Sequence, residues 1–175
     1  MRSSLLSFLF CSLFLSGCAG SSFPDAIEEA SGLIRDGKAE CVLVRDGKIC
    51  YVERGRGVSP LLNVYDLHRD EMKDAVVVDK VIGRAAASIA ICGKVRHVHG
   101  EIMSDDAVEF LKENGITSSA TLLVPRILNQ KRDGLCPLEK SVEGIRDPEK
   151  ALTALRAKIA ALSAGMEQNY SKQKR

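Results

Sequence analysis

An Asp-Gly pair between two short runs of β-forming residues limits the possible folds of this chain more than any other feature. Residues 41–44 and 49–52 are rich in β-forming side chains, and Asp46-Gly47 between them is the strongest short-range signal of a β-hairpin. Farther along, residues at helical spacing alternate with further β-type runs. A hairpin followed by alternating helices and strands predicts one α/β domain, a three-layer α/β/α sandwich with a mixed sheet.

The spacing of apolar residues and the residues that begin or end helices predict the other elements. Helices are expected from Pro24, from Ser59-Pro60, over residues 79–92, from a Ser104 cap to Asn114-Gly115, after Pro137, and from Asp147-Pro148. Strands are expected over residues 95–103 and 121–124. In the last helix Leu152, Leu155, Ile159, Leu162 and Met166 form an apolar stripe, which is typical of a helix lying on a sheet. A coiled-coil partner is the alternative.

Length and charge narrow the class of protein. A chain of 175 residues is long enough for one domain with a single sizeable core. Its net charge of +2 makes no electrostatic case for nucleic acid as a partner. The basic residues at the extreme C-terminus, within a polar tail at 166–175, are typical of a solvated end.

The N-terminus has the pattern of an export signal. Met1-Arg2 is followed by an apolar run over residues 5–15 that is too short to span a bilayer. The run ends in a segment around Cys18 that resembles the bacterial lipobox, where the cysteine is lipidated. We therefore expect a lipoprotein signal peptide at 1–17, a linker at 18–24, a folded domain at 25–165, and a lipid-anchored location in the bacterial cell envelope. The alternative is a start codon placed too far upstream, which would make the protein cytoplasmic.

Four cysteines follow the leader: Cys41, Cys50, Cys92 and Cys136. No C-x-x-C pair occurs among them, so neither a zinc ribbon nor a thioredoxin-type motif is supported. An exported protein can form disulfides. The first three cysteines nevertheless lie within apolar strand or helix patterns, which favours reduced, packed thiols.

The segment 133–140 combines a flexible Asp-Gly turn, a thiol and a helix-starting proline. Cys136 is a candidate nucleophile, because the helix after it and nearby cations such as Lys140 would favour its thiolate. A buried thiol in a tight loop is the alternative. Gly134, Glu139 and Lys140 are candidate ligand contacts in the same segment.

A second candidate segment covers residues 79–84. Asp79 is expected to cap the predicted helix, while Lys80 and Arg84, four residues apart, share a face that can hold an anion such as phosphate. Gly83 within a helix costs about 1 kcal/mol relative to alanine unless something must approach closely. We therefore assign Asp79 and Cys136 as candidate catalytic residues, and Lys80, Gly83 and Arg84 as candidate ligand contacts. A capping aspartate with exposed basic neighbours is the alternative.

Ser104 and the two histidines of the preceding strand, His97 and His99, are the remaining candidate site residues. Ser104, at a helix start, can cap the helix, bind an anion, or do both. Strand alternation puts His97, His99 and Glu101 on one face, a pattern seen in metal sites. His99-Gly100-Glu101 also matches half of the zinc-deaminase signature. Of the other half only one cysteine, Cys136, is present, it precedes its proline, and Glu139 occupies the position of the second thiol. We therefore predict surface or half-buried strand histidines and no metal.

Three segments together carry a resemblance to a known family. They are Gly57–Leu62, Asp79–Ala87, and Leu123–Asn129 with Asp133–Lys140. Over residues 26–160 the chain resembles the bacterial family of domain of unknown function 1893. The resemblance implies a cytidine-deaminase-like α/β/α fold in which the zinc ligands are absent. Family members look cytosolic as a rule, so the lipobox departs from the family pattern.

Two functional hypotheses follow. The first is a zinc-independent, deaminase-like domain that needs no cofactor and binds or transforms a nucleotide-like or other anionic small molecule. The second is a non-catalytic cell-envelope lipoprotein that acts as a protein-interaction module. The resemblance brings no established reaction with it, so the sequence leaves open whether the protein is an enzyme and what its oligomeric state is.

Overall fold

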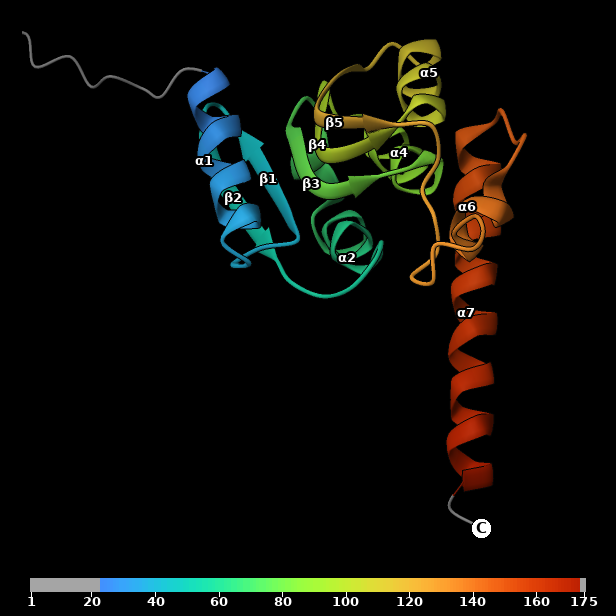
Figure 1. The fold of residues 1–175 in the computed structure, drawn as a ribbon. Coiled ribbons are helices and arrows are strands. Elements are labelled where there is room, and N and C mark those ends of the chain that lie inside the picture. The colour runs from blue at the N-terminus through green and yellow to red at the C-terminus, as the bar shows by residue number, and fades with distance from the viewer. Residues whose placement is uncertain (1–22, 174–175) are drawn as a thin grey trace, which may run out of the picture.

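The computed structural model of the chain describes residues 23–173 (Figure 1). Its strands are β1 (Cys41–Arg45), β2 (Lys48–Glu53), β3 (Val76–Ile82), β4 (His97–Ser104) and β5 (Thr117–Val124). Its helices are α1 (Phe23–Arg35), α2 (Ser59–Leu67), α3 (Arg69–Met72), α4 (Arg84–Cys92), α5 (Asp105–Glu113), α6 (Pro137–Val142) and α7 (Pro148–Gln173). The predicted signal peptide and Cys18 lie outside the described residues.

The five strands form one mixed sheet in the order β2-β1-β3-β4-β5. Strand β1 pairs antiparallel with β2 and β3, whereas β3, β4 and β5 run parallel to one another. Asp46 and Gly47, between β1 and β2, both have positive φ angles, 52° and 71°. A tight hairpin turn of the I′ type requires this conformation. The predicted hairpin and mixed sheet are therefore confirmed.

Helices cover both faces of this sheet, which gives three layers (Figure 1). Helix α1 lies on one face, where Ala26, Ala30 and Ile34 pack against alternate valines of β1 and β3. The intervening residues of these strands, such as Leu43 and Val77, belong to the larger core beneath α2, α4 and α5. Because side chains alternate across a strand, β1 and β3 contribute to both cores. The predicted three-layer α/β/α architecture is confirmed.

Strand β3 is the main correction to the sequence analysis. The helix expected over residues 79–92 is two elements, the strand Val76–Ile82 and the helix Arg84–Cys92. The first four residues of β3 are all buried, because neighbouring strands and both helical layers enclose them. A strand buried on both faces lacks the alternation that marks exposed strands, so its apolar residues also fit a helical spacing.

Strand β5 also differs from its expected bounds, because it begins at Thr117 rather than residue 121. Its first residues are polar and lie outside the strand predicted from the sequence. In the fold their hydroxyl groups lie beside the histidines of β4. This polar pairing across strands replaces the apolar contacts that the prediction looked for.

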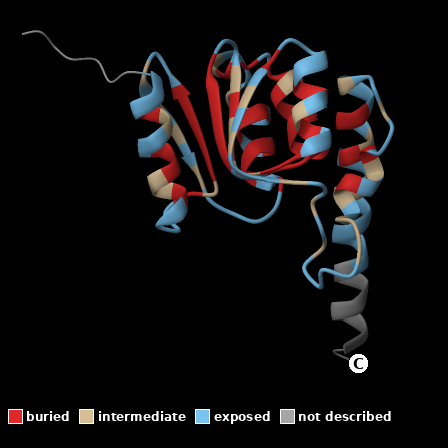
Figure 2. Cartoon of the chain, turned by 45° about the horizontal axis from the view of Figure 1, so that its top comes forward, coloured by how far each residue is buried: buried red, intermediate tan, exposed pale blue. Residues whose placement is uncertain are grey.

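Helix α7 packs on α4 and α6, not on the sheet as expected. Leu152 and Leu155 are buried in that contact, whereas Leu162 is 39% exposed. In Figure 2 the helix passes from buried to exposed colours as it leaves the body of the domain. None of the described helices combines the length and the apolar character that crossing a membrane would need.

The four described cysteines are free thiols. Cys41 and Cys92 are buried, as expected for packed thiols, whereas Cys50 is exposed. Cys50 lies on β2, an edge strand on which every second residue is exposed. The prediction of a packed thiol is therefore wrong for Cys50.

Candidate functional site

Two hollows lie near the carboxyl ends of the parallel strands β3, β4 and β5, the edge at which open α/β sheets bind ligands. The smaller, which we call the Asp79 cleft, has a volume of about 110 Å³. The larger, which we call the Ser104 cleft, has a volume of about 340 Å³. Ile127 and Glu139 line both. The polar side chains of the Asp79 cleft come from Glu40, Asp79, Lys80, Cys136 and Glu139, and its apolar walls include Val58, Val81, Ala85, Ala86 and Leu138.

Asp79 is the most perturbed carboxyl group of this site. It is 5% exposed. Burial raises the pKa of Asp79 to about 7, although hydrogen bonds from the Val81 backbone N–H (3.0 Å) and the Cys41 thiol lower it. Burial and the neighbouring Asp79 in turn raise the pKa of Cys41 well above its usual value, so this thiol stays protonated and can donate. Asp79 is therefore poised to exchange a proton near neutral pH.

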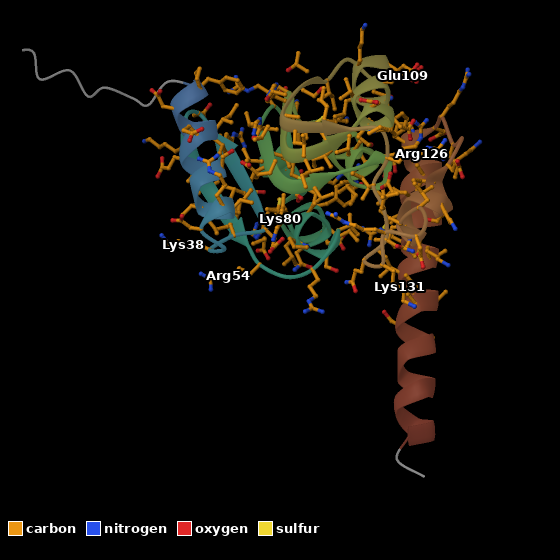
Figure 3. The ribbon with its side chains drawn as sticks, viewed as in Figure 1. Lys38, Arg54, Lys80, Glu109, Arg126 and Lys131 are labelled. Atoms are coloured by element: carbon orange, nitrogen blue, oxygen red, sulfur yellow. The ribbon has the colours of Figure 1, made fainter. Side chains whose placement is uncertain are left out.

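Lys80 lines the Asp79 cleft, but its positive charge is paired with the carboxylate of Glu40. Its Nζ contacts Glu40 Oε1 at 2.9 Å, and its backbone N–H donates to the Glu40 carbonyl at 3.0 Å. Its side chain is half exposed, and Figure 3 shows it on the lower side of the sheet. The predicted face shared by Lys80 and Arg84 does not form, because Lys80 is on a strand and Arg84 begins the next helix.

The side-chain carboxylate of Glu139 occupies the N-terminus of α4. Its two oxygens accept hydrogen bonds from the backbone N–H groups of Arg84 (2.8 Å) and Ala85 (3.1 Å). Burial raises the pKa of Glu139, against these two hydrogen bonds. Gly83 is the N-cap residue of α4 rather than a mid-helix residue, and a Cβ there would overlap the Glu139 carboxyl group. The close approach expected at Gly83 is therefore made by Glu139.

The Ser104 cleft is predominantly acidic. Its side chains include Asp105, Asp106, Glu109, Glu139 and Glu143, with Arg126 as the one cation among the lining residues. Glu109 and Arg126 lie on the same side of the molecule (Figure 3). Ser104 caps α5, since its Oγ accepts from the Ala107 backbone N–H at 3.2 Å. Of the roles expected for Ser104, capping is thus the one that its contacts show.

Arg84 is placed away from the Asp79 cleft. Its guanidinium contacts Asp106 Oδ1 at 2.7 Å and donates to the Ile145 carbonyl at 3.2 and 3.3 Å. Its Cζ lies 4.1 Å from the centre of the Phe110 ring. Arg84 therefore ties α4 to α5 and to the loop before α7.

The segment 133–140 is only partly in the site. Cys136 lines the Asp79 cleft, so the structure brings together the two residues predicted to be catalytic. Gly134 forms part of a turn, in which its carbonyl accepts from the Asn129 backbone N–H at 2.9 Å. Lys140 lines a separate surface hollow with Pro137, Ser141 and Lys158.

His97 and His99 lie on β4 and form a polar ladder with β5. His97 bonds to Thr117 Oγ1 (2.7 Å) and Ser119 Oγ (2.9 Å), and His99 bonds to the same Ser119 Oγ (2.8 Å). Burial lowers the pKa of both histidines. Within residues 23–173 no group of three or more His, Cys, Asp or Glu side chains is arranged to hold a metal ion.

Two residues of the site, Cys41 and Glu40, were not predicted from the sequence. Cys41 begins β1, and its thiol reaches Asp79 because β1 pairs with β3 in a register that sets Cys41 opposite Asp79. Glu40 precedes β1 and meets Lys80 for the same reason. A carboxylate 40 residues from its partner leaves no local signal, so only the strand pairing reveals it.

Together these features define an α/β sandwich domain with two adjoining clefts at the carboxyl edge of its sheet. Residues 29–159 match the family described as "Domain of unknown function (DUF1893)". The chain therefore belongs to this family, as its sequence motifs predicted.

A solved structure of the family has the same fold. The crystal structure of a DUF1893 family protein from Thermotoga maritima covers 76% of this chain and 89% of that chain, with a TM-score of 0.67 and 23% sequence identity. A more distant similarity is to Acinetobacter baumannii RibD, which covers 54% of this chain and 34% of that chain, with a TM-score of 0.41 and 15% identity. No curated protein matches the chain.

Proposed function

We propose that this protein binds a small organic molecule in the Asp79 cleft and that Asp79 exchanges a proton with it. One observation carries the proposal: a buried carboxyl group lines a hollow at the ligand-binding edge of the sheet, with its pKa raised to about 7. A carboxyl group in this state can donate or accept a proton near neutral pH, as general acid–base catalysis requires. Cys136, half-buried in the same cleft, is the candidate for contact with the reacting part of the ligand.

The charges of the site favour a neutral or positively charged ligand group over the anion expected from the sequence. The N-terminus of α4, which would otherwise attract an anion, already holds the Glu139 carboxylate. Lys80 is paired with Glu40, and Arg84 is paired with Asp106. An added anion would therefore meet carboxylates without a free cation among the polar residues of the Asp79 cleft.

A ligand screen by thermal unfolding tests this proposal. We expect ring compounds that are neutral or cationic, such as imidazole, cytosine and benzamidine, to include at least one that raises the melting temperature, because a ligand at about 100 times its Kd adds about 2.7 kcal/mol of stability. Inorganic phosphate should have no effect. Asp79→Asn should abolish the shift, whereas Asp70→Asn, at an exposed position of α3, should keep it.

Further comparisons separate the cleft from the rest of the surface. Lys80→Ala should change the ligand's Kd, while Lys38→Ala, which removes an exposed lysine paired with Asp36 at 2.8 Å, should not. Cys136→Ala should alter binding if the thiol touches the ligand. The proposal fails if none of the ring compounds binds, or if the shift survives Asp79→Asn unchanged.

Membrane anchoring remains a separate proposal, supported by the order of charge, apolar run and lipobox in residues 1–19. We infer an exported protein that is acylated on Cys18. We expect the intact mass of the native protein to show loss of residues 1–17 and added acyl chains. An unmodified mass that includes Met1 would contradict it, and would equally remove the basis for an envelope interaction module.

A further inference from the structure

Strand β5 is an uncovered edge of the sheet. The strand order places it at one end, beside β4, and no other strand of residues 23–173 pairs with its outer side. An edge strand presents a row of unpaired backbone N–H and C=O groups, whose natural partner is another extended strand. Figure 1 shows β5 leading directly into the loop that runs to α6.

The sequence of β5 lacks the devices that normally protect such an edge. Thr117–Val124 contains no charged residue and no proline. Natural edges are usually blocked by charged side chains, prolines or bulges. The opposite edge strand of this sheet, β2, follows that rule, since it begins with Lys48 and ends with Glu53.

Two apolar rows of the sheet run out to this edge and end there uncovered. In one row, Ile82 and Met103 are fully buried, but Leu123, the next member on β5, is 57% exposed. The other row, on the opposite face, consists of Val81 (36% exposed), the half-buried Ile102 and Leu122 (53% exposed), so it is open along its whole length. The buried row of Ile82 and Met103 thus continues to the last strand and ends there in an exposed leucine, as it would if one more strand belonged there.

An apolar hollow adjoins the same end of β5. It has a volume of about 300 Å³, its apolar lining includes Val81, Ile102, Val124 and Leu128, and Arg126, Asn129 and Arg132 supply its polar groups. Leu128 is itself 49% exposed. Exposed apolar side chains that gather in one patch, rather than singly, mark an interaction surface.

We propose that β5 pairs antiparallel with β5 of a second copy of this chain, so that one sheet continues through both subunits. The occupant must be an extended strand without charges, and β5 itself meets that description. The nearest charged residues in the sequence are Glu113 before the strand and Arg126 after it, both exposed. Antiparallel pairing sets Glu113 of each copy toward Arg126 of the other, whereas parallel pairing would bring like charges together.

A two-fold axis through the centre of β5 makes the contact self-complementary. Each copy then supplies the same leucines and the same backbone groups, which is the commonest form of a homodimer interface. The contact closes after two copies, because the sheet formed by residues 23–173 has β5 as its one unprotected edge. A closed dimer also removes the aggregation hazard that an open apolar edge carries.

Sedimentation velocity of the full chain over a dilution series tests this dimer. We expect the wild-type protein to sediment as a dimer at micromolar concentrations, and Leu123→Lys to raise the Kd of the dimer by at least about tenfold, because each copy would then place a lysine ammonium group in the contact. Leu67→Lys is the matched control, since Leu67 is 72% exposed on α2 and should leave the Kd unchanged. Circular dichroism checks that both variants fold.

Hydrogen exchange locates the contact. The backbone amides of β5 that do not bond to β4 should be protected in the dimer and exchange faster on dilution. A monomeric wild-type protein would overturn the proposal, as would a dimer whose Kd is the same in Leu123→Lys. A monomer with protected β5 amides would indicate that another segment of the same chain occupies the edge, and would overturn it as well.

Discussion

Replacing Asp79 with asparagine is expected to stabilise the protein by about 2–4 kcal/mol at about pH 8, an unusual gain for a substitution in a buried site. In the folded state burial raises the pKa of Asp79 to about 7, from 3.8 in the unfolded chain. At pH 8 folding must therefore bury a charged carboxylate, which asparagine avoids. Asparagine has nearly the same shape and still accepts from the Val81 backbone N–H.

The sign of the pH dependence follows from proton linkage. Between about pH 4 and pH 7 the folded protein holds the Asp79 proton and the unfolded chain has released it. The folded state then binds more protons, so this group contributes less stability as the pH rises. At about 1.4 kcal/mol for each pH unit between the two pKa values, the loss has an upper bound of roughly 4 kcal/mol.

Urea unfolding of both proteins at several pH values measures this effect. The histidines His97 and His99 act in the opposite direction, because their pKa values are lowered by burial and they cost stability when acid protonates them. Both proteins keep these histidines, so the difference between wild type and Asp79→Asn isolates Asp79. Asp70→Asn provides the exposed control. A difference that does not change between pH 4 and pH 8 would contradict a raised pKa at Asp79.

Gly83→Ala and Glu139→Ala are each expected to cost about 2–3 kcal/mol of stability, and the double variant little more than either alone. Glu139→Ala leaves two backbone N–H groups of α4 without their acceptor and removes the anchor of α6. In Gly83→Ala the new methyl group displaces the same carboxylate. Both substitutions therefore break one contact, and their effects should not add.

Backbone strain does not complicate this experiment. Gly83 has a φ of −106° and an extended conformation, which alanine adopts freely. The loss in Gly83→Ala therefore reports the overlap with Glu139, measured by chemical unfolding of all four proteins. Glu143→Ala, an exposed carboxylate near the end of α6, is the control and should change stability by less than about 0.5 kcal/mol. Additive losses would show that Gly83 and Glu139 act independently.

Local patterns in the sequence predicted the elements whose signals lie within a few residues. The Asp46-Gly47 turn, the Ser104 cap and the helix start at Pro137 were each predicted from such signals and are present. The family motifs also singled out residues 79–87 and 133–140, and the structure brings these segments together at one cleft. The last four residues of β3, Asp79–Ile82, were predicted to begin a helix, because the burial of this strand does not alternate from residue to residue.

The sequence by itself determined the α/β alternation, the hairpin and the family, because turns, caps and apolar periodicity act between residues close together in the chain. Only the tertiary structure decided which contacts the candidate residues make. It sets Cys41 opposite Asp79, directs Arg84 into the interior, and carries Glu139 across 55 residues to the N-terminus of α4. These contacts join distant segments, so the charge and protonation of the cleft depend on how the strands and helices pack.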